Sequence, residues 1–150
     1  DPDGVHDIVI NLQGDMPTLD PAVIKSAMAL MNEPAVDIAT LAAPIRDEDE
    51  MHNPAVVKAV VKDGRAQTFT RAPVAGAYHH IGIYVYRRTA LGAFVKLPPS
   101  PMEKKEKLEQ LRAMEAGMRI DVAIVDTVPL GVDTPETLQK ARAWHETQRS

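Results

Sequence analysis

Two aspartates lie next to predicted strand and helix ends, where an α/β protein can bind a metal ion. Asp15 ends the segment Gln13–Asp15, which follows the apolar run Ile8–Leu12, a run typical of a buried parallel strand. Ligands of open α/β sheets bind beyond the carboxyl ends of strands, where a carboxylate can ligate a hard cation. Asp133 precedes a helix that begins near residue 134. Either residue alone could be a solvated or capping aspartate. If the strands that precede them are neighbours, the two together meet the minimum that Mg²⁺ needs beside waters and substrate phosphates.

A second candidate site lies on the segment His79–Arg87. Strand alternation places His80, Gly82, Tyr84 and Tyr86 on one face. The Ile and Val residues between them lie on the other, which is the core face. Gly82 leaves a hollow between two hydrogen-bonding side chains, and such a hollow could hold a polar ligand such as a sugar. The alternative is a half-exposed strand with amphipathic side chains at its rim.

Other polar residues have weaker local signals. Arg71 presents a guanidinium fork that could pair with a carboxylate or phosphate, or it is a surface arginine. Glu109 and Gln110 lie beside the apolar stripe of a charged helix and could equally be part of a solvated face. The sequence has no Walker A loop, no G-x-G-x-x-G, no G-x-S-x-G and no H-E-x-x-H.

The rest of the pattern predicts the elements that position these residues. Strands and helices alternate, with one antiparallel hairpin at Asp63-Gly64. We therefore predict one domain over 1–150 with a mixed, mostly parallel α/β sheet flanked by helices. The predicted elements are a helix from Asp20-Pro21 to Pro34, strands 38–43, 55–62, 65–70, 79–87 and 120–125, and helices 90–95, 102–116 and 134–148.

Composition limits the classes of function. The 150 residues are 45% hydrophobic, enough for one sizeable core. The net charge of −4 argues against a nucleic-acid partner or an anionic membrane surface. The absence of Cys excludes disulfides and thiolate chemistry, and no apolar run approaches the roughly 20 residues of a membrane helix. We expect a cytoplasmic protein without membrane insertion.

Five segments in this order and spacing resemble the CMP-Kdo synthetases, the 3-deoxy-manno-octulosonate (Kdo) cytidylyltransferases of lipopolysaccharide synthesis. Any one of these segments is a weak motif, but five in register are specific, and the resemblance covers nearly the whole chain. The segments are Ile10–Pro17, Ala39–Ala42, His80–Tyr84, Leu108–Arg112 and Gly131–Glu136.

The resemblance implies a nucleotide-diphospho-sugar transferase-like, Rossmann-like fold and a homodimer. It implies an enzyme that joins CTP and Kdo to give CMP-Kdo and pyrophosphate. Asp15 and Asp133 would then act in catalysis by holding Mg²⁺, and Arg71 matches a family arginine that follows an aromatic-Ser/Thr pair. The residues that would contact Kdo are Gln13, His80, Tyr84, Glu109 and Gln110.

The chain departs from the family pattern in two ways. The family has a further N-terminal part with a loop that grips the CTP phosphates, and the loop Ala72–Tyr78 is short. We therefore expect a fold that is incomplete at its N-terminus and an isolated chain that makes no CMP-Kdo. The alternatives are a cytidylyltransferase for another acidic sugar (sialic acid or amino-Kdo) and a non-catalytic sugar- or partner-binding fragment.

Overall fold

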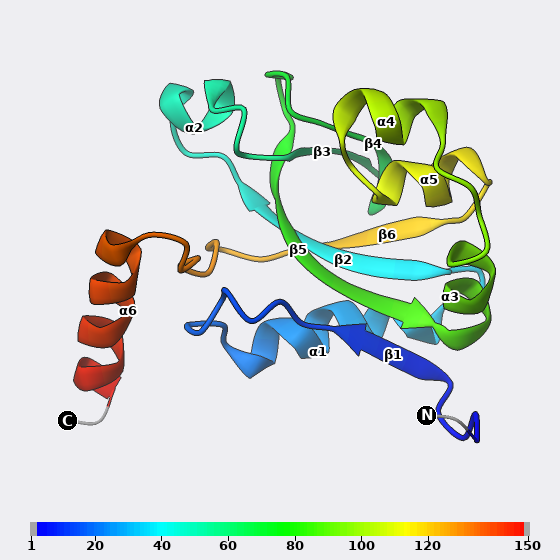
Figure 1. Cartoon of the computed structure of the whole chain (residues 1–150), viewed down its shortest axis with the longest axis horizontal. Helices are drawn as coiled ribbons and strands as arrows, with labels where there is room; N and C mark the ends of the chain where they lie inside the picture. The colour runs from blue at the N-terminus through cyan, green and yellow to red at the C-terminus, as the bar shows by residue number, and fades with distance from the viewer. Residues whose placement is uncertain (1–2, 149–150) are drawn as a thin grey trace.

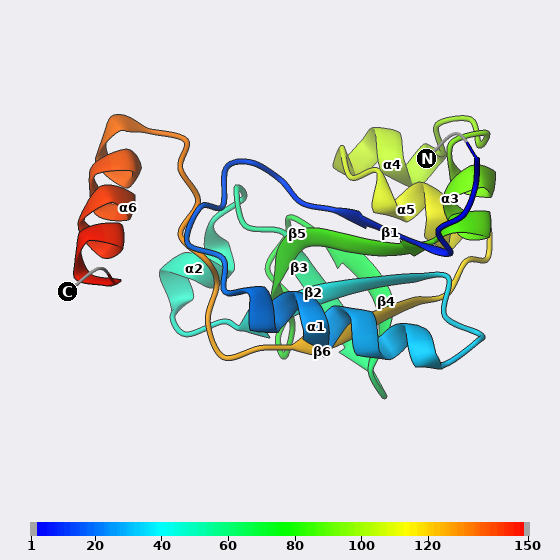
Figure 2. The same cartoon turned by 90° about the horizontal axis from the view of Figure 1, so that it is seen from below.

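A computed structural model describes residues 3–148 and shows a six-stranded sheet with helices on both faces (Figures 1 and 2). The strand order is β1-β5-β2-β6-β4-β3, and a further pairing between β3 and β5 closes five of these strands into a ring. The elements are β1 (Ile8–Asn11), α1 (Pro21–Ala29), the 3₁₀ turn η1 (Leu30–Asn32), β2 (Ile38–Pro44), α2 (Glu48–His52), β3 (Lys58–Lys62), β4 (Arg65–Thr70), β5 (Tyr78–Arg87), α3 (Arg88–Phe94), α4 (Pro101–Glu106), α5 (Gln110–Glu115), β6 (Ile120–Ile124) and α6 (Pro135–Gln148).

The sheet is mixed, as predicted, but the prediction that it is mostly parallel is wrong. Only β2 and β6 pair in parallel within residues 3–148. The long strand β5 runs antiparallel to β1, β2 and β3, and β4 runs antiparallel to both of its neighbours. Short connections such as the β3–β4 hairpin reverse the chain and therefore produce antiparallel pairs.

The strand predicted as buried and parallel at Ile8–Leu12 is an antiparallel edge strand. β1 pairs with β5, and its exposure increases along its length, so that Ile10 is 37% exposed and Leu12, just beyond its end, is 51% exposed. A short apolar run indicates a strand but carries no information about its direction or its neighbours.

Two apolar clusters hold the layers together. One lies between the sheet and α1 and contains Ile81, Ile83 and Val85 of β5. The other lies on the opposite face, where Phe69 and Tyr86 pack with residues of α5. The predicted alternation of β5 is therefore confirmed, because its aliphatic residues face α1 and its aromatic residues face α3 and α5.

The predicted helix cap at Asp20 and the predicted turn at Asp63-Gly64 are both confirmed. The Asp20 side chain accepts a hydrogen bond of 2.8 Å from the backbone N–H of Ala22, which caps α1 ahead of Pro21. Asp63 and Gly64 both have positive φ (52° and 74°), as the tight turn between β3 and β4 requires.

The helix predicted over Met102–Ala116 is two helices. Lys107 adopts the left-handed conformation (φ 57°, ψ 45°) and ends α4, and α5 begins at Gln110. Helical periodicity continues across this break, so the sequence pattern alone does not reveal it. The break turns residues 107–110 toward the sheet.

The last helix stands apart from the sheet and follows a long connection from β6 (Figure 1). Its predicted start after Thr134 and its end at Gln148 are confirmed. Among its residues Ala141 is buried, whereas Leu138 and Trp144 are each 40% exposed. No helix within residues 3–148 is long and apolar enough to span a membrane.

Candidate functional site

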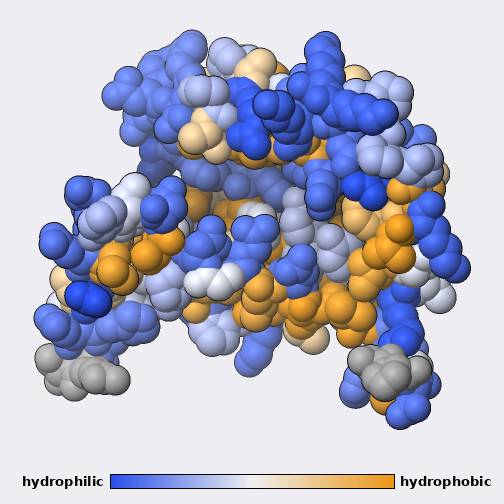
Figure 3. Space-filling model, in the orientation of Figure 1, coloured by the Kyte–Doolittle hydropathy of each residue, from blue (hydrophilic) through white to orange (hydrophobic). Residues whose placement is uncertain are grey.

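A cavity of about 220 Å³ opens between β1, β5 and the break that separates α4 from α5. Figure 3 shows a hollow between the α4–α5 pair and the apolar surface around β1. Both polar and aromatic side chains face it, which suits a ligand with many hydroxyl groups. Its lining residues are Asn11, Gln13, Ile38, Tyr84, Tyr86, Phe94, Lys107, Leu108, Glu109 and Gln110.

Gln13 reaches this cavity by crossing Gly82 of β5. A Cβ atom placed on Gly82 would lie 3.5 Å from Nε2 of Gln13 and 3.7 Å from Cδ and Oε1 of the same side chain. The hollow that the sequence predicts above Gly82 therefore exists, and the Gln13 amide occupies it. The amide can both donate and accept hydrogen bonds at the wall of the cavity.

An aromatic row along β5 forms the back of the cavity. The rings of His80 and Tyr84 have centroids 5.6 Å apart, those of Tyr84 and Tyr86 are 5.8 Å apart, and Tyr86 stacks on Phe94 at 6.3 Å. Burial, followed by the nearby Tyr86 and Glu109, raises the pKa of the Tyr84 phenol above its ordinary value of 10. Tyr84 is therefore a neutral hydrogen-bond donor and acceptor at pH 7.

An ion pair joins α4 to α5, the helix whose N-terminus carries Glu109 and Gln110. Arg112 of α5 binds both carboxylate oxygens of Glu103 of α4, with distances of 2.6 Å and 2.8 Å. Glu103 and Ser100 also form a capping box at the start of α4. The Arg112 guanidinium lies 4.9 Å from the centre of the Phe94 ring. Lys107–Gln110 are thereby held against β5.

His80 lies behind the cavity rather than at its wall. Its side chain is buried, and its ring packs edge-on against Phe69 at 4.9 Å. Nε2 of His80 lies 2.9 Å from the hydroxyl of Thr40 on β2. Burial, with a smaller contribution from the neighbouring His79, lowers the pKa of His80 from 6.5 to about 3. His80 is therefore neutral at physiological pH.

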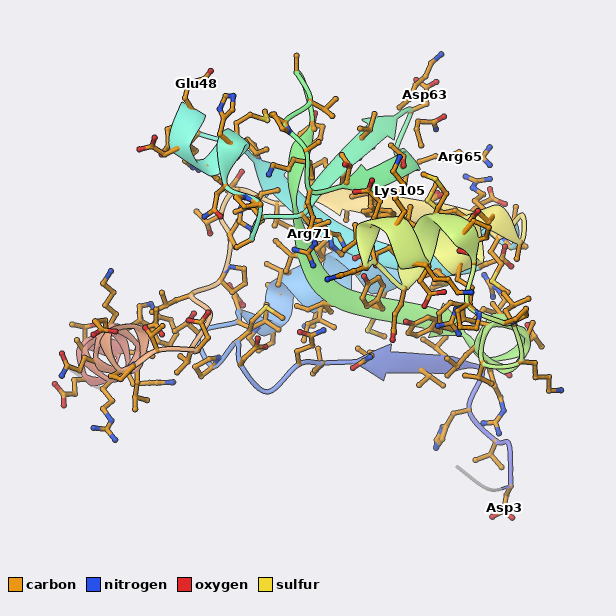
Figure 4. The ribbon with its side chains drawn as sticks, turned by 45° about the horizontal axis from the view of Figure 1, so that its top comes forward. Asp3, Glu48, Asp63, Arg65, Arg71 and Lys105 are labelled. Carbon is orange, nitrogen blue, oxygen red and sulfur yellow. The ribbon has the colours of Figure 1, made fainter. Side chains whose placement is uncertain are left out.

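Arg71 is separate from the cavity. Figure 4 places it beside α4, where its guanidinium donates to the backbone carbonyls of Glu106 (3.4 Å) and Pro54 (3.1 Å). Its own carbonyl accepts a hydrogen bond from Nζ of Lys58, which is fully buried. The structure therefore gives Arg71 a local role in joining two loops to α4.

The segments that carry Asp15 and Asp133 lie side by side. The backbone N–H of Val132 donates to the carbonyl oxygen of Asp15 at 2.6 Å, and the N–H of Leu130 donates to Oγ1 of Thr18 at 2.9 Å. Both aspartates are exposed. Among the described residues, the Asp133 carboxylate accepts one hydrogen bond, a long one of 3.4 Å from the Thr137 hydroxyl. These contacts join two regions that are more than 100 residues apart in the sequence.

The donor chemistry at this junction fits a magnesium ion. Two accessible carboxylates suit a hard cation that completes its shell with waters and substrate phosphates. Residues 3–148 contain no group of three or more His, Cys, Asp or Glu side chains placed to ligate a metal. A structural zinc-type centre therefore has no support among the described residues, whereas the two carboxylates at this junction are of the donor type that magnesium prefers.

The structure brings half of the predicted residues to one place. Gln13, Tyr84, Glu109 and Gln110 line the same cavity, whereas His80, Arg71 and the two aspartates do not. The cavity is also lined by Asn11, Phe94 and Lys107, which were not predicted from the sequence. Alternation along β5 indicated the face of Tyr86, but no sequence signal placed Phe94 or Lys107.

Comparisons with known proteins show the family of this chain. A family model described as "Cytidylyltransferase" matches residues 1–120. The 3-deoxy-manno-octulosonate cytidylyltransferase of Parvibaculum lavamentivorans is 59% identical over 95% of this chain and 59% of its own length. That of Methylobacterium radiotolerans is 56% identical over 99% of this chain and 64% of its own length.

A solved structure gives the same result in three dimensions. It is of a CMP:2-keto-3-deoxy-manno-octonic acid synthetase complexed with CTP, and it superposes with a TM-score of 0.90 at 38% identity, covering 98% of this chain and 65% of the other. The chain therefore spans roughly three fifths of the length of the curated relatives it matches. By sequence and by fold, it belongs to the cytidylyltransferase family.

Proposed function

We propose that this chain carries the sugar site and the metal ligands of an enzyme that transfers a cytidylyl group from CTP to Kdo. The observation that carries the proposal is the cavity between β1, β5 and the α4–α5 break. Its polar side chains come from three separate segments, and all of them except Tyr86 and Lys107 lie within the five segments that resemble CMP-Kdo synthetases. The proposal includes a homodimer and a cytoplasmic location, both of which rest on the resemblance.

The cavity residues would bind and orient the sugar. The Gln13 amide and the Tyr84 hydroxyl can each donate and accept, and the Glu109 carboxylate accepts from sugar hydroxyls. Orientation matters because the reaction is a direct displacement. The anomeric hydroxyl of Kdo attacks the α-phosphorus of CTP and loses its proton, while the bond to the β-phosphate oxygen breaks and pyrophosphate leaves.

Asp15 and Asp133 would hold Mg²⁺ at the edge of this site. When bound, the ion neutralises phosphate charge and polarises the phosphoryl group. The two carboxylates are accessible, and the hydrogen bond between Val132 and Asp15 keeps their segments adjacent. Such a displacement needs positioning and charge neutralisation but no covalent enzyme intermediate, in keeping with a chain without an evident nucleophile.

A chimera tests the proposal. In it, this chain replaces the matching segment of the Parvibaculum lavamentivorans relative, which supplies the remaining two fifths. We expect magnesium-dependent pyrophosphate release with CTP and Kdo. Preference for sialic acid or amino-Kdo would favour a related cytidylyltransferase. A folded chimera that releases no pyrophosphate with any of these sugars would favour the non-catalytic alternative.

Replacing Gly82 with Leu should weaken sugar binding selectively. The new side chain would displace the Gln13 amide, which already lies 3.5 Å from the position of a Cβ atom. We expect the dissociation constant for Kdo to rise roughly tenfold or more, since that corresponds to about 1.4 kcal/mol, the scale of one or two hydrogen bonds. Calorimetric titration of the chimera with Kdo and with CTP measures both affinities.

Gly92→Leu is the matched control, because a Cβ at Gly92 on α3 meets nothing within 4 Å. This control should bind both ligands as the unmodified chimera does. Equal losses of Kdo and CTP affinity in the Gly82 variant would indicate a folding defect and would contradict the assigned sugar pocket.

A further inference from the structure

Thr40 occupies an irregular place in the sheet, where β2 and β5 pair. Thr40 is opposite Tyr84, but the next residue, Leu41, is opposite Ile81, so β5 carries two extra residues between these pairs. The Thr40 side chain is fully buried at this bulge. A polar side chain in such a place must find partners for its hydroxyl group, because an unpaired buried hydroxyl is destabilising.

The hydroxyl has three neighbours and only one proton. Oγ1 of Thr40 lies 2.7 Å from the carbonyl oxygen of Ile83, 3.2 Å from that of Ile81 and 2.9 Å from Nε2 of His80. Two oxygen atoms 2.7 Å apart repel each other unless a proton lies between them, and a carbonyl oxygen has none to give. Thr40 therefore donates to the bulge carbonyls, mainly to that of Ile83.

This assignment leaves Nε2 of His80 only one way to bond. Because the Thr40 hydroxyl proton is donated to the bulge carbonyls, its oxygen can only accept from the histidine ring. Nε2 must therefore carry a proton and donate it. Burial lowers the pKa of His80 to about 3, so the ring is neutral at pH 7 and carries one proton in total. Its other nitrogen, Nδ1, is then a bare acceptor.

Nδ1 also remains open to a ligand. Within residues 3–148, Nδ1 of His80 has no hydrogen-bond partner. Every fully buried side-chain nitrogen or oxygen in the same residues has one. Nδ1 is therefore not sealed in the core. The His80 ring adjoins that of Tyr84, which lines the cavity.

We propose that Thr40 is a positioning residue for sugar recognition: it holds His80 in the Nε2–H tautomer, so that Nδ1 accepts a hydrogen bond from a substrate hydroxyl. The same hydroxyl group ties down the bulge that brings Gly82 beneath Gln13. Thr40 touches no ligand itself and acts through these two groups. The role in recognition rests on the proposed function, whereas the tautomer does not.

Nuclear magnetic resonance of the unmodified chain tests the tautomer directly. Histidine ring nitrogens are labelled with ¹⁵N, and the His80 signals are identified by their loss in the His80→Gln variant. We expect a single neutral tautomer with its proton on Nε2 at pH 7. A proton on Nδ1, or rapid averaging between the two nitrogens, overturns the proposal. This result does not depend on activity or on any variant of Thr40.

Paired substitutions test the role in recognition. Thr40→Ser keeps the hydroxyl group, and Thr40→Val keeps the shape but removes it. In the chimera, we expect Thr40→Ser to bind Kdo within about threefold of the unmodified protein, and Thr40→Val to bind Kdo roughly tenfold more weakly, the scale of one lost hydrogen bond. CTP affinity should be unchanged in both variants.

Two results contradict the positioning role. Unchanged Kdo affinity in Thr40→Val would show that the tautomer does not matter to the ligand. Parallel losses of Kdo and CTP affinity with a lower melting temperature would show that Thr40 is only structural. If Thr40→Val does not fold, the ring signals of Thr40→Ser decide, because a shift to the Nδ1–H form there overturns the assignment. An unmodified chimera that binds no Kdo contradicts the proposed function, while the tautomer measurement still stands.

Discussion

Replacing Asp133 with Asn in the chimera is expected to slow pyrophosphate release by roughly 10²-fold or more, the scale of losing one preorganised group that stabilises transferring charge. The substitution keeps the size of the side chain but removes the negative charge that would hold Mg²⁺. Asp15→Asn should have an effect of the same size. Both variants should need higher magnesium concentrations for half-maximal rate, which a titration of the rate with MgCl₂ measures.

Stability should change little in these variants. Both aspartates are exposed, and neither forms an ion pair within the described residues. Exposed charges contribute little to the free energy of unfolding. A coupled assay of pyrophosphate release should therefore show a large kinetic defect in a protein whose melting temperature is close to that of the unmodified chimera.

Asp63→Asn is the matched control for this experiment. Asp63 lies at the tip of the β3–β4 hairpin (Figure 4), and asparagine tolerates its positive φ of 52°. The control should retain full activity. If Asp133→Asn and Asp15→Asn are as active as Asp63→Asn at limiting magnesium, the two carboxylates do not hold the metal, and the site must be sought elsewhere.

Local chemistry explains which parts of the fold could be predicted. The cap at Asp20 and the turn at Asp63-Gly64 depend on contacts within a few residues, so the sequence indicated them. Strand direction depends on distant partners, and the run from Ile8 contains no information about β5. The same limit applies to the end of α4 at Lys107, where no glycine marks the left-handed residue.

In the candidate site, too, local patterns were predicted and long-range contacts were not. Alternation along β5 placed His80 and Tyr84 on one face, and this is correct. Alternation could not show that Thr40, which is 40 residues away in the sequence, is hydrogen-bonded to the buried His80 ring. The partnership of Glu103 with Arg112 was likewise hidden, because periodicity predicted one continuous helix and the pair needs two. Long-range contacts therefore account for what sequence reasoning missed.

The buried histidine should make the stability of this chain depend strongly on pH in mildly acidic solution. Burial lowers the pKa of His80 from 6.5 to about 3, so the unfolded chain takes up a proton near pH 6.5 and the folded chain does not until about pH 3. Between these values the unfolded state binds more protons. The free energy of unfolding therefore falls as the pH is lowered, and the contribution is fully present only above pH 6.5.

The expected effect can be measured by difference. When the unfolded state binds one proton more than the folded state, the free energy of unfolding falls by roughly 1.4 kcal/mol per pH unit. Because this difference develops gradually below pH 6.5, His80 should account for about 2 kcal/mol between pH 6.5 and 4.5. His80→Gln removes the titrating group but keeps an amide that can donate to Thr40. Urea unfolding of both proteins at the two pH values should show a smaller loss of stability in the variant by about that amount.

His52→Gln, at an exposed position on α2, should lose as much stability as the unmodified chain. Because carboxylates such as Glu50 are common to all three proteins, their contributions cancel in the comparison. Equal losses in the unmodified chain and in His80→Gln would mean that His80 is protonated within the fold, and its assignment as a neutral ring behind the cavity would then be wrong.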